Sequence, residues 1–178
     1  MAKHFHANSD YPKYPEIVRH HSTTKKAIEN YFDSSADLLG TPEKEVKSLR
    51  SAALVHQEKQ DMLTLLAFLE TCFRVDYLLR KEMNLKDHFS KDLIRTFNRR
   101  NKRASLEKDI VKSWLKREKF THSTYDRILA AFQFRHWLAH GQYWDPSLLK
   151  IHDFQDLADF TEALARKCSF KTLSDVQV

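Results

Sequence analysis

Apolar residues recur every three or four positions along most of the central part of the chain, with polar residues between them. This spacing places the apolar side chains on one face of an α-helix. The longest such stretch begins at Glu43 and is predicted to form one helix to about Met83, or two helices that break near residues 57–61. The positions that keep its spacing are Val46, Leu49, Ala53, His56, Leu63, Leu66, Phe73 and Tyr77.

Residues that favour helix ends predict further helices on both sides of this stretch. The first is expected to start after Ser22 or Thr23 and to end near Gly40, because glycine adopts the left-handed conformation that commonly ends a helix. Other helices are expected to follow residues whose side chains accept a hydrogen bond from a helix N-terminus. These N-cap candidates are Ser90, Ser105, Ser123 and Asp153.

Glycine and proline, which commonly interrupt helices and strands, are scarce. The chain has two glycines and four prolines, and neither type occurs between Glu43 and His140. A β-rich fold needs turn-forming residues repeatedly over such a length. The sequence therefore predicts an all-α, single-domain helical bundle of about five to seven helices. Residues 1–21 are expected to form a flexible N-terminal arm, residues 22–170 the helical domain, and residues 171–178 a C-terminal tail.

Composition narrows the class of protein. A chain of 178 residues with 42% hydrophobic residues can bury a core of its own. It has no apolar run long enough to span a membrane, and its first residues lack the apolar segment of a signal peptide. We expect a soluble, cytoplasmic protein with no membrane contact. Its two cysteines, Cys72 and Cys168, are predicted to be reduced thiols, and no zinc motif is present.

Positive charge is concentrated in one window. The formal net charge is +6, and residues 98–119 alone contain nine basic and three acidic residues, the same surplus as the whole chain. Such a cluster attracts phosphate backbones, although a solvated helix face has the same composition. The residues predicted to contact nucleic acid are Arg99, Arg100, Lys102, Arg103, Lys112 and Lys116.

The segment F-R-H-W-L-A-H-G, residues 134–141, carries the most specific chemistry. Arginine presents a planar set of donors that matches phosphate, and histidine exchanges protons near neutral pH. Arg135 and His140 together suit the cleavage of RNA by its own 2′-hydroxyl, which requires neither metal nor cofactor. Two structural alternatives remain: His140 binds backbone carbonyls at a helix end, or Arg135 only pairs with an acid such as Glu70 or Asp76.

The spacing within this segment sets a geometric condition. On an unbroken helix, five positions place Arg135 and His140 roughly 140° apart, so they do not share a face. Either the helix ends near Ala139, as Gly141 indicates, or two subunits contribute to one site across a two-fold axis. The residues suited to such a subunit interface are Trp137, Leu138, Tyr143 and Trp144.

The hexapeptide R-H-W-L-A-H resembles the R-x4-6-H motif of HEPN domains. The resemblance implies a helical bundle that dimerises and cleaves RNA without metal, leaving 2′,3′-cyclic phosphate and 5′-hydroxyl ends. It also implies a place in toxin–antitoxin systems, phage defence or RNA processing. Arg135 and His140 would then be catalytic, and His136 would support them.

Two further residues are expected to support the motif. If Glu70 packs near Arg135, its carboxylate would hold the guanidinium in place. One HEPN subgroup has a tyrosine two residues after the motif histidine, which a partner nucleotidyltransferase modifies. This chain has Gln142 there and Tyr143 one position later, so it departs from that subgroup.

Three hypotheses for function follow. The first is a homodimeric, metal-independent endoribonuclease of the HEPN type, guided to RNA by its basic window. The second is a non-catalytic HEPN-like module that binds nucleic acid or dimerises. The third is an antitoxin or regulatory subunit, and in either role a partner protein is expected to bind the chain.

Overall fold

The computed structural model describes residues 12–117, 119–140 and 153–172, and regular structure within these ranges is entirely helical. Three short helices occur: the 3₁₀-helices η1 (Ala36–Leu38) and η2 (Asn101–Arg103), and the π-helix η3 (Leu106–Val111). The all-α class and the expected number of helices are confirmed for this part of the chain. Its six α-helices are α1 (Tyr14–Ser34), α2 (Glu43–Glu82), α3 (His88–Arg100), α4 (Lys112–Lys116), α5 (His122–Ala139) and α6 (Phe154–Cys168).

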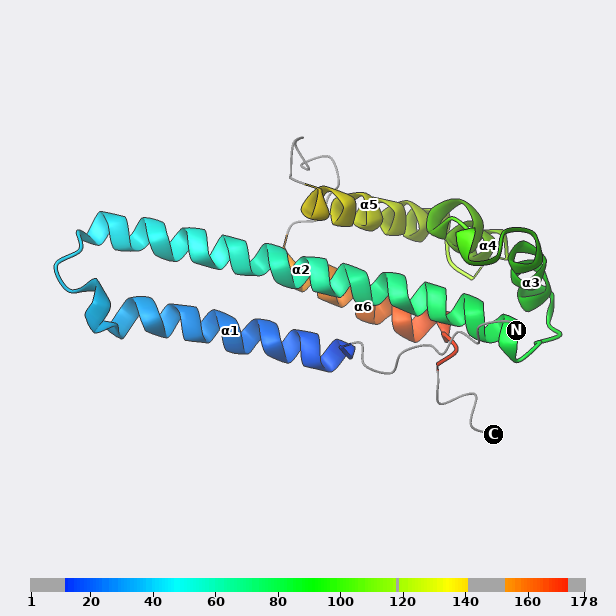
Figure 1. Ribbon diagram of the computed structural model, residues 1–178, viewed down its shortest axis with the longest axis horizontal. Helices are drawn as coiled ribbons and strands as arrows, with labels where there is room; N and C mark the ends of the chain where they lie inside the picture. The colour runs from blue at the N-terminus through cyan, green and yellow to red at the C-terminus, as the bar shows by residue number, and fades with distance from the viewer. Residues whose placement is uncertain (1–11, 118, 141–152, 173–178) are drawn as a thin grey trace.

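Helix α2 is the axis of the fold. Its 40 residues run for about 60 Å without a break, so the predicted interruption near residues 57–61 is absent. Helix α1 lies antiparallel to the first half of α2, and α5 and α6 lie along the second half of α2 (Figure 1). The connected ends of α1 and α2 extend beyond α5 and α6 as a helical hairpin (Figure 1). Helices α1, α3, α5 and α6 and the π-helix η3 thus pack against α2.

The first helix begins earlier than the sequence predicted. It starts at Tyr14 rather than after Ser22, so residues 14–21 belong to a helix and not to the N-terminal arm. Proline is well tolerated in a first helical turn, where its missing N–H has no partner to lose, and Pro15 occupies such a position. The Glu16 carboxylate also accepts a hydrogen bond from the Lys13 N–H at 2.9 Å.

The predicted helix starts are partly confirmed. Ser105 and Asp153 each accept a hydrogen bond from a backbone N–H of the first turn that follows them. The other two predictions were wrong, because Asp87 and Thr121 cap α3 and α5 instead. In both cases a residue two or three positions earlier, whose side chain also accepts hydrogen bonds at a helix N-terminus, is the N-cap.

The end of α6 is fixed to α2 by aromatic packing. Phe73 and Trp114 are fully buried, and their rings meet edge to face at 5.8 Å. The Phe170 ring lies 4.9 Å from the Phe73 ring. The Lys171 N–H donates to the Asp76 carboxylate at 2.8 Å. Residues 170 and 171 are therefore part of the packed body, and the rest of the predicted tail from residue 173 lies outside the described residues.

A buried ion pair joins three elements of this core. Asp76 is 0% exposed, and its carboxylate accepts a hydrogen bond from Arg80 Nε at 2.7 Å. Arg80 Nη1 donates to Ser90 Oγ on α3 at 2.9 Å, and the guanidinium lies 4.6 Å from the centre of the Phe89 ring. Burial raises the pKa of the Asp76 carboxyl, and the Arg80 guanidinium opposes that shift. The pair thus connects α2, α3 and the segment after α6.

Both cysteines are free, as predicted. Cys168 is buried and Cys72 half-buried, and burial raises the pKa of each thiol to about 12. Near neutral pH the thiols therefore stay protonated and unreactive, since the thiolate is the nucleophile. We expect both to react with a colorimetric disulfide reagent at pH 8 at least about tenfold more slowly in the native protein than in denaturant. A native thiol that reacts at the denatured rate would contradict this burial.

Within the described ranges, no helix combines the length and apolar character needed to cross a bilayer. The large apolar side chains that are exposed in these ranges all lie on the α1–α2 hairpin and its connection. They are Tyr31, Leu39, Leu49 and Val55.

Candidate functional site

Helix α5 carries the Arg135–His140 motif and ends within it. The last helical residue is Ala139, and His140 leaves the helix with φ −116° and ψ 29°. Its N–H still donates to the His136 carbonyl at 3.0 Å. The helix therefore ends where the sequence indicated, which releases His140 from the angle of an unbroken helix. Gly141 itself lies outside the described residues.

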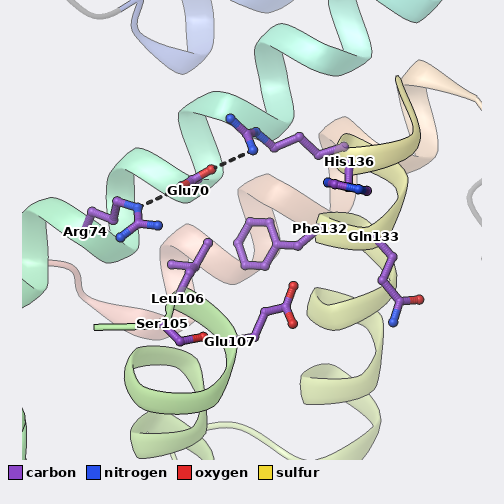
Figure 2. Close-up of a pocket in the computed structure, with 9 residues that line it drawn as sticks. Glu70, Arg74, Ser105, Leu106, Glu107, Phe132, Gln133 and His136 are labelled. Atoms are coloured by element: carbon purple, nitrogen blue, oxygen red, sulfur yellow. Dashed lines mark hydrogen bonds and ion pairs between the residues drawn. The ribbon is translucent and has the colours of Figure 1, made fainter. Parts of the chain in front are cut away.

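Arg135 is held by an acid on the neighbouring helix α2. Its Nη1 lies 3.1 Å from Glu70 Oε2, while Glu70 Oε1 accepts a hydrogen bond from Arg74 Nε at 2.6 Å. Figure 2 shows Glu70 between the two guanidinium groups. Asp76, the other acid considered as a partner for Arg135, pairs with Arg80 instead. The expected contact between Glu70 and Arg135 is thus present.

The Arg135 guanidinium retains donor capacity. Its side chain is 39% exposed, yet its Nε is buried and has no hydrogen-bond partner among the described residues. Glu70 fixes the Nη1 group, and the exposed part of the guanidinium can donate to a further acceptor. A phosphate oxygen is the acceptor that this planar fork matches best.

An open pocket of about 550 Å³ surrounds this ion pair, which is within the size range of small-ligand sites. Three elements form its walls: α2, η3 with the residue before it, and α5 (Figure 2). Its charged groups are the two guanidiniums, the Glu70 carboxylate between them, and Glu107. The lining residues are Glu70, Arg74, Ser105, Leu106, Glu107, Phe132, Gln133, Arg135 and His136.

The rings of the motif's two histidines lie close together at the end of α5, with their planes tilted at 46° to each other. Both are exposed, and their ring centres lie 4.3 Å apart. His136 lines the pocket with Arg135, whereas His140 does not and lies beside His136, one turn further on. Within one chain, therefore, an arginine and one histidine share the pocket, and a second histidine stands next to it.

The predicted nucleic-acid contacts separate into two groups. Arg99, Lys112 and Lys116 line a second hollow, which is formed by α3, η3, α4 and the first residue of α5. Arg100 lies 3.5 Å from Asp109, and Arg103 is exposed. The Lys102 side chain and Tyr143 lie outside the described part of the chain.

The expectation for Trp137 was wrong. Its side chain is 6% exposed and stacks on Phe134 at 5.4 Å inside the chain's own core, so it is not free to form a subunit interface. Leu138 packs against the same cluster. Tyr143 and Trp144 lie outside the described residues. Trp137 is buried because α5 packs its apolar face against α2, and Trp137 is part of that face.

Residues that sequence reasoning missed come from elements distant in the sequence. Ser105, Leu106 and Glu107 reach the pocket because η3 packs against α2. The only local signal near them was the N-cap role predicted for Ser105. Within the described ranges, no three histidine, cysteine or acidic side chains lie together as a metal site would require.

Comparison with known proteins identified no similar sequence or structure. No family model matches the sequence, and neither a curated protein nor a solved structure matches the chain.

Proposed function

We propose that the protein is a metal-independent endoribonuclease of the HEPN type that acts as a cytoplasmic effector in a toxin or phage-defence role. One observation carries the proposal: Arg135 and His136 line a single open pocket, and the His140 imidazole lies 4.3 Å from that of His136. RNA cleavage by the 2′-hydroxyl requires a group that stabilises charge on the phosphate and a group that transfers protons near neutral pH. A guanidinium and an imidazole supply these two functions.

Each residue has a distinct part in the proposed reaction. The ribose O2′ bonds to phosphorus while the bond from phosphorus to O5′ breaks, which leaves a 2′,3′-cyclic phosphate and a 5′-hydroxyl. His140 transfers one proton, either from the attacking 2′-hydroxyl or to the departing O5′, and solvent water carries the other. Arg135 neutralises the charge that grows on the phosphoryl oxygens. Glu70 holds the guanidinium, and His136 contacts the ring of His140.

The test is incubation of the purified protein with RNA in the presence of excess chelator. The proposal predicts fragments that end in 2′,3′-cyclic phosphate and begin with a 5′-hydroxyl. Fragments with 3′-hydroxyl and 5′-phosphate ends, or activity that the chelator abolishes, would contradict the mechanism. RNA that is bound but remains intact would favour the non-catalytic binding module instead.

Glu70 is expected to matter through the position of Arg135. The change Glu70→Gln removes the charge that fixes the guanidinium, and a displaced catalytic group costs up to about 10²-fold in rate. Single-turnover cleavage measures the effect. Glu162→Gln is the matched control, because Glu162 also pairs with an arginine, Arg166, but on the exposed face of α6. Equal rates for both variants would remove Glu70 from the site.

Mixing two inactive variants tests whether two subunits build the site. If Arg135 of one subunit acts with His140 of the other, dimers of Arg135→Ala and His140→Ala chains contain one intact site. Random pairing then restores about a quarter of the parental activity. Mixtures that stay inactive, although subunit exchange is shown by mass spectrometry, would place both residues of a site in the same chain.

A further inference from the structure

A second hollow lies further along η3 than the motif pocket. It measures about 520 Å³ and is formed by α3, η3, α4 and the first residue of α5. Four cationic side chains line it, together with one acid, one histidine, two small hydroxyl side chains and Leu115. The lining cations are Arg99, Lys108, Lys112 and Lys116.

The acids near this hollow are neutralised by other residues. Asp109, in the lining, accepts a hydrogen bond from the Ser105 N–H at 2.8 Å and lies 3.5 Å from Arg100 Nε. Asp92, in an adjoining depression that shares Arg99 and Lys116 with the hollow, accepts from Arg117 Nε at 2.7 Å. In the described part of the chain the four lining cations have no ion-pair partner. The hollow therefore keeps a surplus of positive charge.

The π-helix η3 and helix α5 connect this hollow to the motif pocket. Leu106 and Glu107 face the motif pocket, and the next residues, Lys108 and Asp109, line the hollow. Helix α5 contributes His122 to the hollow and Arg135 to the pocket. Those two residues are 13 positions apart, which corresponds to about 20 Å along the helix. A π-helix is rare and often marks a functional position.

We propose that the hollow binds backbone phosphates of single-stranded RNA at a fixed distance from the site of cleavage. The proposal rests on the endoribonuclease function and specifies its substrate. The span of about 20 Å from Arg135 to His122 is several times the spacing of about 3.4 Å between successive phosphates along one DNA strand. A strand that reaches from the pocket to the far end of the hollow must therefore extend several nucleotides on one side of the cut. Shorter RNA enters the pocket but gains nothing from the hollow.

Binding is tested first, in the inactive His140→Ala chain, so that cleavage does not interfere. Fluorescence anisotropy with a labelled RNA of about 16 nucleotides compares Lys112→Glu/Lys116→Glu with Lys25→Glu/Lys26→Glu. The control pair makes the same charge change at exposed positions of α1. We expect the first pair to weaken binding at least about tenfold and to make the salt dependence shallower by about 1.4 in log–log slope. Equal weakening by both pairs, or none, would overturn the hollow as a site.

Cleavage is tested second, with His140 restored. For long RNA, Lys112→Glu/Lys116→Glu should raise KM and leave kcat unchanged, because the lost contacts are remote from the reacting atoms. For RNA with about two nucleotides on each side of the cut, the variant should match the parent. An equal loss on both lengths would overturn the spacing. A parent that binds RNA through the hollow yet never cuts it would refute the endoribonuclease proposal and leave the hollow as an RNA-binding site.

Discussion

Replacing His140 with alanine is expected to lower the rate of RNA cleavage by about 10²–10⁴-fold, the usual cost of losing a positioned acid–base group. The side chain is exposed and its ring lies 4.3 Å from that of His136, so its loss should leave the fold intact. Single-turnover kinetics at saturating enzyme measure the effect on the chemical step.

His56→Ala provides the control for this experiment. His56 is also exposed, but it lies on α2 far from the motif in sequence and outside the pocket. Its removal should not change the rate, and circular dichroism should report the same helicity for both variants. A His140→Ala protein that cuts RNA as fast as the His56→Ala protein would show that His140 has no part in catalysis.

The second large effect is expected on stability, at the buried pair of Asp76 and Arg80. The change Arg80→Met leaves the Asp76 carboxylate buried without its cation, and breaking such a pair costs about 3–5 kcal/mol. A domain of this size loses about 2–4 °C of Tm per kcal/mol. Urea unfolding followed by circular dichroism gives the free energy of unfolding directly.

Arg166→Met is the matched comparison. Arg166 pairs with Glu162 at the same spacing of four residues, but both side chains are exposed on α6. An exposed pair of this kind contributes about 0.3–0.5 kcal/mol. If the two variants lost the same free energy of unfolding, the Asp76–Arg80 pair would not hold α2, α3 and the segment after α6 together.

The sequence predicted the helices well where local chemistry decides them. Helix α2 is continuous because neither glycine nor proline interrupts its apolar spacing, and Ser105 and Asp153 cap the helices that follow them. The misses arise where two residues compete for one role. Asp87 and Thr121 are the N-caps in place of Ser90 and Ser123. Pro15 lies in the first turn of α1, although the sequence predicted a flexible arm there.

The candidate site was only partly predictable, since its walls come from distant segments. Arg135, His136 and the end of α5 were expected from the motif and from Gly141. The contact of Glu70 with Arg135 was one alternative among several. The contribution of η3 was not foreseen, because the packing of η3 against α2 is a tertiary contact that leaves no periodic signal. For the same reason Trp137 was assigned to a subunit interface, although it fills the core.

The most direct measurement is a crystal structure of the protein, in the assembly it forms in solution, with an RNA whose 2′-hydroxyl at the cleavage position is replaced by hydrogen. This analogue cannot be cut by its own ribose. We expect its scissile phosphate about 3 Å from the guanidinium of Arg135, with the His140 imidazole of the same or the other subunit within hydrogen-bond reach. A phosphate bound elsewhere, with these two groups apart in every copy, would contradict the proposed function.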